Sequence, residues 1–244
     1  MTTSLSACST ASRSRFAVAR RIARPSRARA HALPIRMGPP LPSVELGRVL
    51  PGGESAKVTL GAWLDYACPF SAKAYKALVE QVGPHYGEDL KVVFYHQVQP
   101  WHPQSPILHE AAIAVHQLGG DAAFYKFSSA LMDGQKDFFD ANVWDKSRAD
   151  LHKTLAALAS SSAGVKEEDV LAKLARAVEE GALNTGNACT LELKFYVKLG
   201  RQTGIHVSPT TTLNGMVCDT SSSWDLEQWR AFLDPHVRAA KGAA

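Results

Sequence analysis

The stretch LDYACPFSAKAY, residues 64–75, decides the fold of this chain. It overlaps the run KVTLGAWLDYA at 57–67, which is apolar on both faces and therefore predicts a central, covered strand. From Pro69 onward the apolar residues recur at helical spacing, which predicts a helix that begins at Cys68. A second covered strand, LKVVFYHQV, follows at 90–98. This strand-helix-strand unit predicts a parallel pair of strands in an α/β fold.

The spacing from 105 to about 203 is helical almost throughout. Ser105–Pro106 predicts an N-cap followed by a first-turn proline, and Gly119–Gly120 predicts the end of that helix. We expect Gly83–Pro84 to end the earlier helix in the same way, and a later apolar stripe extends to Val178. Because no segment resembles another, the pattern indicates a helical insertion and not a repeat array.

The chain returns to strands at 208–219, SPTTTLNGMVCD. Asn214–Gly215 is the strongest short signal for a two-residue hairpin turn, and it pairs Leu213 with Met216. The segment SSSWDLEQWRAFLDP at 221–235 then predicts a closing helix.

The composition is that of an ordinary soluble globular protein. With 244 residues, 45% hydrophobic and 20% charged, the chain can bury the core of one sizeable domain. It contains no apolar run of the roughly 18 residues that a membrane span needs. Its cysteines are Cys8, Cys68, Cys189 and Cys218, and their wide, irregular spacing predicts neither a disulfide framework nor a metal site.

The basic residues are concentrated at the N-terminus. Residues 1–36 hold eight arginines and no acidic residue, so the rest of the chain has more acidic than basic side chains despite the net charge of +4. A leader rich in Ser, Thr, Ala and Arg predicts a transit peptide, and we expect a chloroplast address, with the mitochondrion as the alternative. A basic arm for nucleic acid or anionic lipid is another interpretation. A disordered extension before a start at Met37, which would give a cytoplasmic protein, is the third.

The order of elements resembles the DsbA-like thioredoxin-fold proteins of eukaryotes. The resemblance covers 45–236 and is carried by LDYACPFS, QPWHPQSPILHEAAIAV and GRQTGIHVSPTTTLNG. It implies an α/β, thioredoxin-like fold of the DsbA type, with the helical insertion at about 105–203. It also places the family's nucleophilic cysteine at Cys68 and its cis-proline at Pro209. The family's resolving cysteine falls on Ser71, so this chain is a monothiol, C-P-F-S variant.

The residues themselves indicate how one thiol could react. Cys68 lies where the first N–H groups of a helix have no partner, which stabilises a thiolate. We expect Ser71 to offer its hydroxyl to the sulfur, although it cannot attack a mixed disulfide. Pro69 and Phe70 are candidate substrate-binding residues beside the thiol. The resemblance adds Ser208 and Pro209, with the backbone of Ser208 facing Cys68 so that it pairs with a substrate peptide or glutathione.

These residues predict a thiol–disulfide oxidoreductase that uses glutathione or a protein thiol as its resolving partner, without a bound cofactor or metal. Glutathione would be a co-substrate. One alternative is a glutathione-dependent transferase or isomerase of the kappa type, in which a serine hydroxyl occupies the position of Cys68. Another is a non-catalytic peptide-binding module on the same fold. We expect no nucleic-acid partner, because the basic residues are confined to the leader.

The remaining cysteine, histidine and aspartate residues have other expected roles. The hairpin register pairs Thr211 with Cys218, one strand too far from Cys68 for a disulfide, so Cys218 is expected to be structural. The histidines are also expected to be structural or exposed, although His102 would lie near the site if its loop folds over it. Asp65 either lies under the helix start, where it would raise the pKa of the Cys68 thiol, or accepts hydrogen bonds at the strand end.

Overall fold

The computed structural model describes residues 41–242. The expected transit peptide at 1–36, together with Cys8 and Met37, lies outside the described residues. The strands are β1 (Arg48–Val49), β2 (Val58–Leu64), β3 (Leu90–His96), β4 (Thr210–Leu213) and β5 (Met216–Cys218). The longer helices are α1 (Pro69–Ala77), α3 (Ser105–Asp133), α5 (Arg148–Ala163), α6 (Glu167–Leu174), α7 (Thr190–Gln202) and α8 (Leu226–Gly242).

The five described strands form one sheet in the order β1-β3-β2-β4-β5. The predicted parallel pairing of β2 with β3 is confirmed, and the remaining neighbours are antiparallel. The hairpin has the expected register, with Leu213 opposite Met216. Both turn residues, Asn214 and Gly215, have positive φ angles (50° and 85°), as a type I′ turn requires. The β2 strand is therefore central and lies between β3 and the hairpin.

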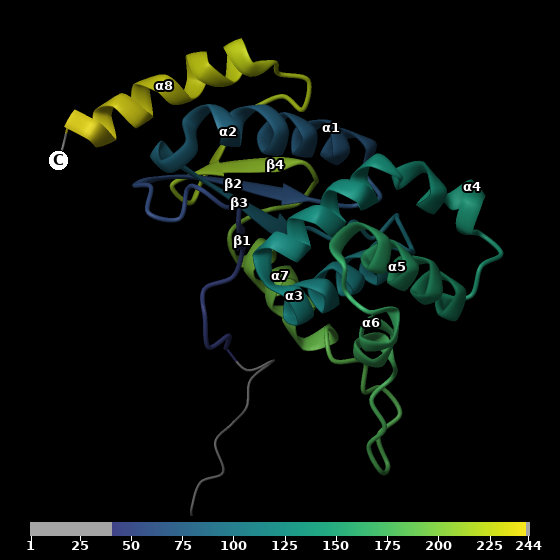
Figure 1. The fold of residues 1–244 in the computed structure, drawn as a ribbon. Coiled ribbons are helices and arrows are strands. Elements are labelled where there is room, and N and C mark those ends of the chain that lie inside the picture. The colour runs from purple at the N-terminus through teal and green to yellow at the C-terminus, as the bar shows by residue number, and fades with distance from the viewer. Residues whose placement is uncertain (1–40, 243–244) are drawn as a thin grey trace, which may run out of the picture. The chain divides into compact units, whose positions relative to one another are not determined.

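Helices cover both faces of the sheet. In Figure 1, α1 and α8 lie above the sheet and α7 lies below it, while α3, α5 and α6 pack together as a helical block. One continuous core joins these parts, because Leu60 of β2, Phe124 of α3 and Trp229 of α8 are buried in the same cluster. The hydrophobic effect thus ties the helical segment to the sheet on which the site is built.

The first helix does not end at Gly83–Pro84, contrary to the sequence prediction. It continues through a π-helical turn (Leu78–Val82) into α2 (Gly83–Tyr86). The N–H of Gly83 donates to the carbonyl of Leu78, five residues earlier, which shifts the hydrogen-bond ladder just before the proline. Because Pro84 has no N–H to donate, the shift allows it to occupy the first turn of a new helical segment.

The helical insertion differs from the prediction in two places, at Ser105 and at Val178. Ser105 is the first residue of α3 and not its side-chain cap, because its hydroxyl donates to Asp65. Gly120, with non-helical φ and ψ angles of 69° and −169°, ends the first part of α3 at a kink, as the sequence predicted, and a second helical part follows. The helix α6 stops at Leu174, and Val178 is 82% exposed on a loop that protrudes from the body in Figure 1. That loop is closed by its own backbone, so Val178 has no core to enter.

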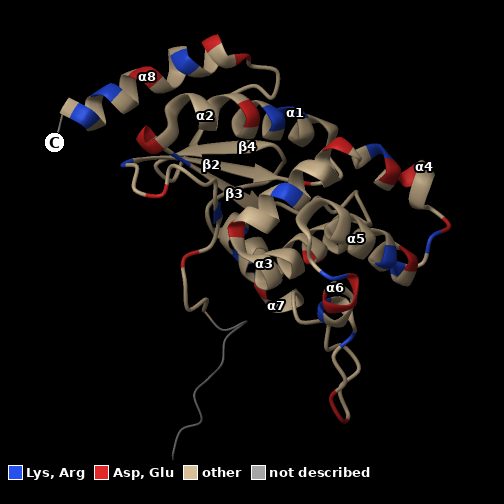
Figure 2. Ribbon diagram, viewed as in Figure 1, with Lys and Arg blue, Asp and Glu red and all other residues tan. Residues whose placement is uncertain are grey.

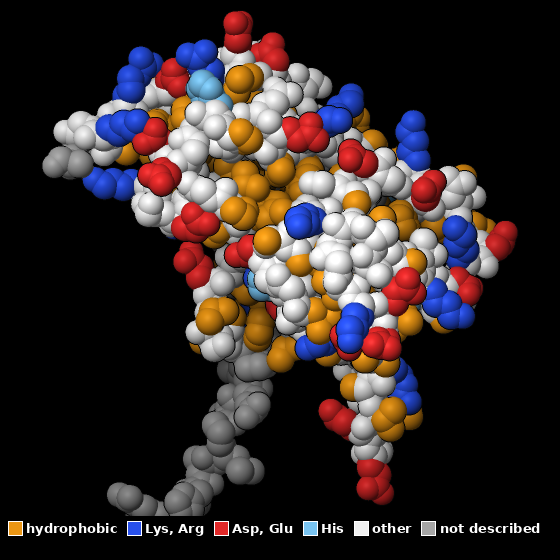
Figure 3. Space-filling model, in the orientation of Figure 1, with side chains coloured by type: hydrophobic (Ala, Val, Ile, Leu, Met, Phe, Trp, Pro, Cys, Tyr) orange, Lys and Arg blue, Asp and Glu red, His pale blue; other side chains and the backbone are white. Residues whose placement is uncertain are grey.

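Charged side chains are mixed on the surface. Figure 2 shows basic and acidic residues alternating along α8, whereas the central strands β2 and β4 are almost free of both. On the face drawn in Figure 3, positive and negative side chains are interspersed over the whole body. Among the described helices, none combines the length and the apolar character needed to cross a membrane.

Candidate functional site around Cys68

Cys68 lies where the central strand turns into the first helix. It is the N-cap of α1, and its N–H donates to the carbonyl of Asp65 at 3.1 Å, which closes the turn after β2. Its side chain makes no capping hydrogen bond, and Pro69 follows in the first turn. The side chain is 6% exposed. The predicted arrangement is therefore present, with a sulfur at a helix N-terminus whose first N–H groups are not capped by that side chain.

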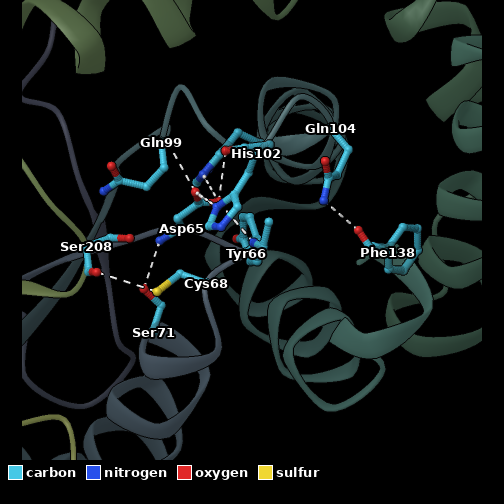
Figure 4. Close-up of polar contacts among 12 residues, drawn as sticks. Asp65, Tyr66, Cys68, Ser71, Gln99, His102, Gln104, Phe138 and Ser208 are labelled. Atoms are coloured by element: carbon cyan, nitrogen blue, oxygen red, sulfur yellow. Dashed lines mark hydrogen bonds and ion pairs between the residues drawn. The ribbon is translucent and has the colours of Figure 1, made fainter. Parts of the chain in front are cut away.

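The entrance to β4 supplies the second part of the site. The thiol of Cys68 donates to the carbonyl oxygen of Ser208, with a distance of 3.5 Å between Sγ and O (Figure 4). The peptide bond between Ser208 and Pro209 is cis. Because β4 pairs with β2, the segment that carries Ser208 lies beside the strand that carries Cys68. The structure thus brings together the two regions that the sequence analysis assigned to one site.

Ser71 has a different role from the one expected. It is fully buried, and its Oγ accepts a hydrogen bond from the N–H of Asp65 at 3.2 Å. Within residues 41–242 it forms no hydrogen bond with the sulfur of Cys68. The hydroxyl therefore joins the helix start to the end of β2, because the backbone donor there would otherwise be buried without a partner. Phe70 and Pro69, in contrast, are exposed beside the thiol.

Asp65 is the polar centre beneath the site. Its carboxylate is fully buried and accepts from the N–H of Ala67 at 2.9 Å and the hydroxyl of Ser105 at 2.8 Å. The second oxygen accepts from the N–H of Gln99 at 3.1 Å and contacts Nδ1 of His102 at 2.9 Å (Figure 4). Of the two roles considered from the sequence, the contacts match the hydrogen-bond acceptor. They also bring His102 to the edge of the site.

The pKa of Asp65 is low, so its carboxyl group is ionised in the folded protein. Burial alone would raise the pKa of this carboxyl, but contact with His109, the hydrogen bond with His102 and the N–H of Ala67 outweigh burial and lower the pKa to about 2. The Nε2 atom of His109 lies 3.5 Å from the Asp65 carboxylate, a close contact without hydrogen-bond geometry. Asp65 is therefore a carboxylate throughout the neutral pH range.

Two buried histidines, His96 and His109, contact each other next to the Asp65 carboxylate. Nδ1 of His96 and Nδ1 of His109 are 2.7 Å apart, so one of them donates to the other. Burial, followed by the charge of His109, lowers the pKa of His96 well below its ordinary value, which keeps that ring neutral. Both rings also pack against Tyr66 in the core. The structural role expected for these histidines agrees with their positions.

Gln135, from the helical insertion, was missed by the sequence analysis. Its side-chain amide donates to the carbonyls of Tyr66 at 2.6 Å and Cys68 at 2.9 Å. It follows the end of α3 and is separated from Cys68 by 67 positions. No local pattern could have marked a glutamine at that distance in the chain. The insertion therefore forms hydrogen bonds directly with the backbone around Cys68.

The other described cysteines are not placed to react with Cys68. Cys68, Cys189 and Cys218 are all free thiols. Cys189 is fully buried, and burial, followed by the charges of Glu110 and Glu192, raises its pKa to about 12. Cys218 pairs with Thr211 in β5, one strand beyond β4, as the register predicted. Among the described residues, no group of three or more His, Cys, Asp or Glu side chains is arranged to hold a metal ion.

The fold and the site together define a class of protein. A central β2-α1-β3 unit, a cysteine at the start of α1 and a hairpin entered through a cis-proline form a thioredoxin-like fold with a helical insertion, as in DsbA-type proteins. A family model described as thioredoxin matches residues 45–235, and the chain belongs to this family. At the level of the family, the match supports thiol–disulfide oxidoreductase chemistry.

Solved structures of similar fold come from bacteria. A candidate protein-disulfide isomerase from Pseudomonas syringae is 25% identical, with a TM-score of 0.59 over 73% of this chain and 94% of that protein. Oxidised BdbD from Bacillus subtilis is 18% identical, with a TM-score of 0.58 over 82% of this chain and 97% of its own. A variant of α-DsbA1 from Wolbachia pipientis is 13% identical, with a TM-score of 0.59 over 83% and 96%. No curated protein sequence gave a significant match.

Proposed function

We propose that this chain is a thiol–disulfide oxidoreductase that acts through the single thiol of Cys68, with glutathione or a protein thiol as the second thiol. The observation that carries the proposal is the position of Cys68, at the N-terminus of α1 and 3.5 Å from the carbonyl of Ser208. In thiol–disulfide exchange the nucleophile is the thiolate, and the first N–H groups of a helix are hydrogen-bond donors at this position. The Ser208 carbonyl is a hydrogen-bond acceptor beside the sulfur, where the backbone of a bound substrate would lie.

The reaction needs two exchanges. In the first, the Cys68 thiolate attacks a disulfide, one S–S bond forms to Cys68, and the other sulfur leaves as a thiolate that takes up a proton. In the second, an external thiolate attacks the substrate sulfur of the mixed disulfide and forms a new disulfide, so that Cys68 is released as a thiolate. Electrons balance, because each step makes one S–S bond and breaks one.

The second thiol is proposed to come from outside because of what surrounds Cys68. Ser71 takes the position of a resolving cysteine. It carries a hydroxyl in place of a thiol, and this hydroxyl accepts a hydrogen bond from the N–H of Asp65. Cys189 is fully buried in the insertion, and Cys218 lies in a strand that does not pair with β2. Glutathione and protein thiols are the common partners that meet this chemical requirement.

The proposal is tested by incubating the protein with glutathione disulfide and identifying the products by mass spectrometry. We expect one glutathionyl group on Cys68, its removal by reduced glutathione, and no reaction in Cys68→Ser. Cys218→Ser is the matched control and should behave as the unmodified protein does. Failure of Cys68 to form the adduct at any pH that preserves the fold would contradict the proposal.

A non-catalytic, peptide-binding function is the second candidate, and the small exposure of Cys68 favours it. With 6% of the residue accessible, the sulfur must be uncovered before it can attack. Alkylation by iodoacetamide separates the two functions, because the reagent reports the exposed thiolate. Reaction of Cys68 in the folded protein supports the oxidoreductase. Reaction only after denaturant is added supports the binding module.

A further inference from the structure

Gln99 is buried beside the site with its amide unpaired. It is 1% exposed, and among residues 41–242 neither its Nε2 nor its Oε1 has a hydrogen-bond partner. Its backbone, in contrast, is fully used, since its N–H donates to Asp65 and its carbonyl accepts from His102. A buried carboxamide that makes none of its hydrogen bonds costs folding free energy, so this residue type is unfavourable for the fold alone.

Ser208, whose carbonyl accepts from Cys68, also has a side-chain hydroxyl that is unpaired among the described residues. The Oγ atom of Ser208 is also buried and has no hydrogen-bond partner in the described part of the chain. In Figure 4 the side chain of Gln99 extends away from His102, toward the side of the site where Ser208 lies. In this view the unpaired amide therefore extends to the same side of the site as Ser208, whose carbonyl accepts from Cys68.

We propose that Gln99 is a specificity-determining residue that binds a peptide group next to the substrate cysteine. A carboxamide presents one donor and one acceptor side by side, which complements the C=O and N–H of a peptide. Such groups flank the cysteine in glutathione and in protein substrates alike. This inference rests on the proposed function, because it assigns the group that is recognised when Cys68 carries a mixed disulfide.

Binding of a peptide group requires the Gln99 amide to be uncovered. Trp101, two residues after Gln99, is 58% exposed, and Val207, just before Ser208, is 52% exposed. Because these two side chains are largely exposed, moving them costs less free energy than opening the core. When the sulfur of Cys68 enters a mixed disulfide, its S–H is also lost, and the Ser208 carbonyl is free to accept from the incoming peptide.

The test compares two adducts of the same thiol. The full chain, with Cys8, Cys189 and Cys218 replaced by alanine, is treated with the 2-pyridyl disulfide of glutathione or of 2-mercaptoethanol. The Cys68 thiolate displaces pyridine-2-thiolate, which leaves either a glutathionyl adduct with peptide groups or a hydroxyethyl adduct without them. We expect the glutathionyl adduct to melt about 3 °C higher than the hydroxyethyl adduct.

Gln99→Leu should remove this difference, whereas Gln97→Leu, a nearby buried glutamine whose amide lies against α7, should keep it. Gln99→Leu should also raise the melting temperature of the unmodified protein by about 2 °C, because an unpaired buried amide is replaced by an apolar group. A residue that only supports the fold would instead lower it. This stability gain separates recognition from a structural role.

A third adduct, from a short blocked cysteine peptide, identifies the source of the peptide group. Stabilisation of the peptide adduct alone indicates protein substrates, and stabilisation of the glutathionyl adduct alone indicates glutathione. An unchanged difference between the adducts in Gln99→Leu would overturn the inference and leave the proposed function intact. Failure of Cys68 to accept any adduct would contradict the proposed function itself.

Discussion

The thiol of Cys68 donates a hydrogen bond to the carbonyl of Ser208, which lies 140 positions later in the chain, at a distance of 3.5 Å. This contact joins the start of α1 to the entrance of β4. It depends on the placement of β4 directly beside β2 in the sheet. When the thiol loses its proton this hydrogen bond is lost as well, and the Ser208 carbonyl is left without this donor.

Ser71→Cys should convert the site from one thiol to two. The new sulfur would stand three residues after Cys68, within the first turn of α1, where it can attack a mixed disulfide on Cys68. We expect the glutathionyl adduct to decay into an intramolecular disulfide that has lost two hydrogen atoms by mass spectrometry. Ser71→Ala is the control and should keep the adduct. A stable glutathionyl adduct in Ser71→Cys would show that the buried position cannot reach the sulfur.

Because of Asp65, the stability of the folded state should depend on pH in the acidic range. Its pKa in the folded protein, about 2, is below its ordinary value of 3.8, so the native state favours the carboxylate. The resulting stabilisation, about 2 kcal/mol, is complete above about pH 4 and is lost as the pH falls toward 2. Urea unfolding between pH 5 and pH 2.5 should show this loss in the unmodified protein and in Asp145→Asn, which changes an exposed carboxyl. Asp65→Asn should be less stable at pH 5 and should lack this component.

Gln135→Ala should destabilise the protein by about 1 to 3 kcal/mol, because it leaves the buried carbonyls of Tyr66 and Cys68 without this donor. Denaturant unfolding at neutral pH measures the change. The exposed neighbour provides the control, and Lys136→Ala should alter the free energy of unfolding by less than about 0.5 kcal/mol. Equal stability of the two variants would mean that the hydrogen bonds of Gln135 with Tyr66 and Cys68 do not stabilise the protein.

We propose that residues 1–36 direct the protein to the chloroplast. A fusion of this segment to a fluorescent protein should accumulate in chloroplasts and be shortened near its junction. Replacement of its eight arginines by glutamine should abolish import, because the positive charge of a transit peptide is part of its signal. Accumulation in mitochondria would select the alternative address. A fusion that stays in the cytoplasm at full length would contradict both.

Much of the fold could be predicted from local patterns. Asn214–Gly215 determined the register of the hairpin, because a two-residue turn leaves one pairing of its strands. The double-sided apolar character of β2 predicted its central position. Glycine and proline signals differed in value, since the helix passes through Gly83–Pro84 but is interrupted at Gly120 as predicted. The Gly83–Pro84 pattern predicted the end of the first helix, but the π-helical turn before Pro84 continues it.

The site was only partly predictable. Cys68 and Ser208 were paired in advance through the family resemblance, but the partner of Ser71 was not. The Ser71 hydroxyl accepts from the backbone N–H of Asp65, six positions away. This hydrogen bond depends on the buried turn between β2 and α1. Gln135 and Gln99 carry no local signal, because what distinguishes them is the presence or absence of partners in three dimensions.

The contacts of Asp65 have a consequence for the modularity of this protein. Its carboxylate is bound by groups 2, 34, 37 and 40 positions along the chain, the last of which, Ser105, is the first residue of the helical insertion. Excising the insertion would therefore leave a buried charge with fewer donors at the centre of the parent fold. The parent fold and the insertion therefore share the hydrogen bonds of one buried carboxylate.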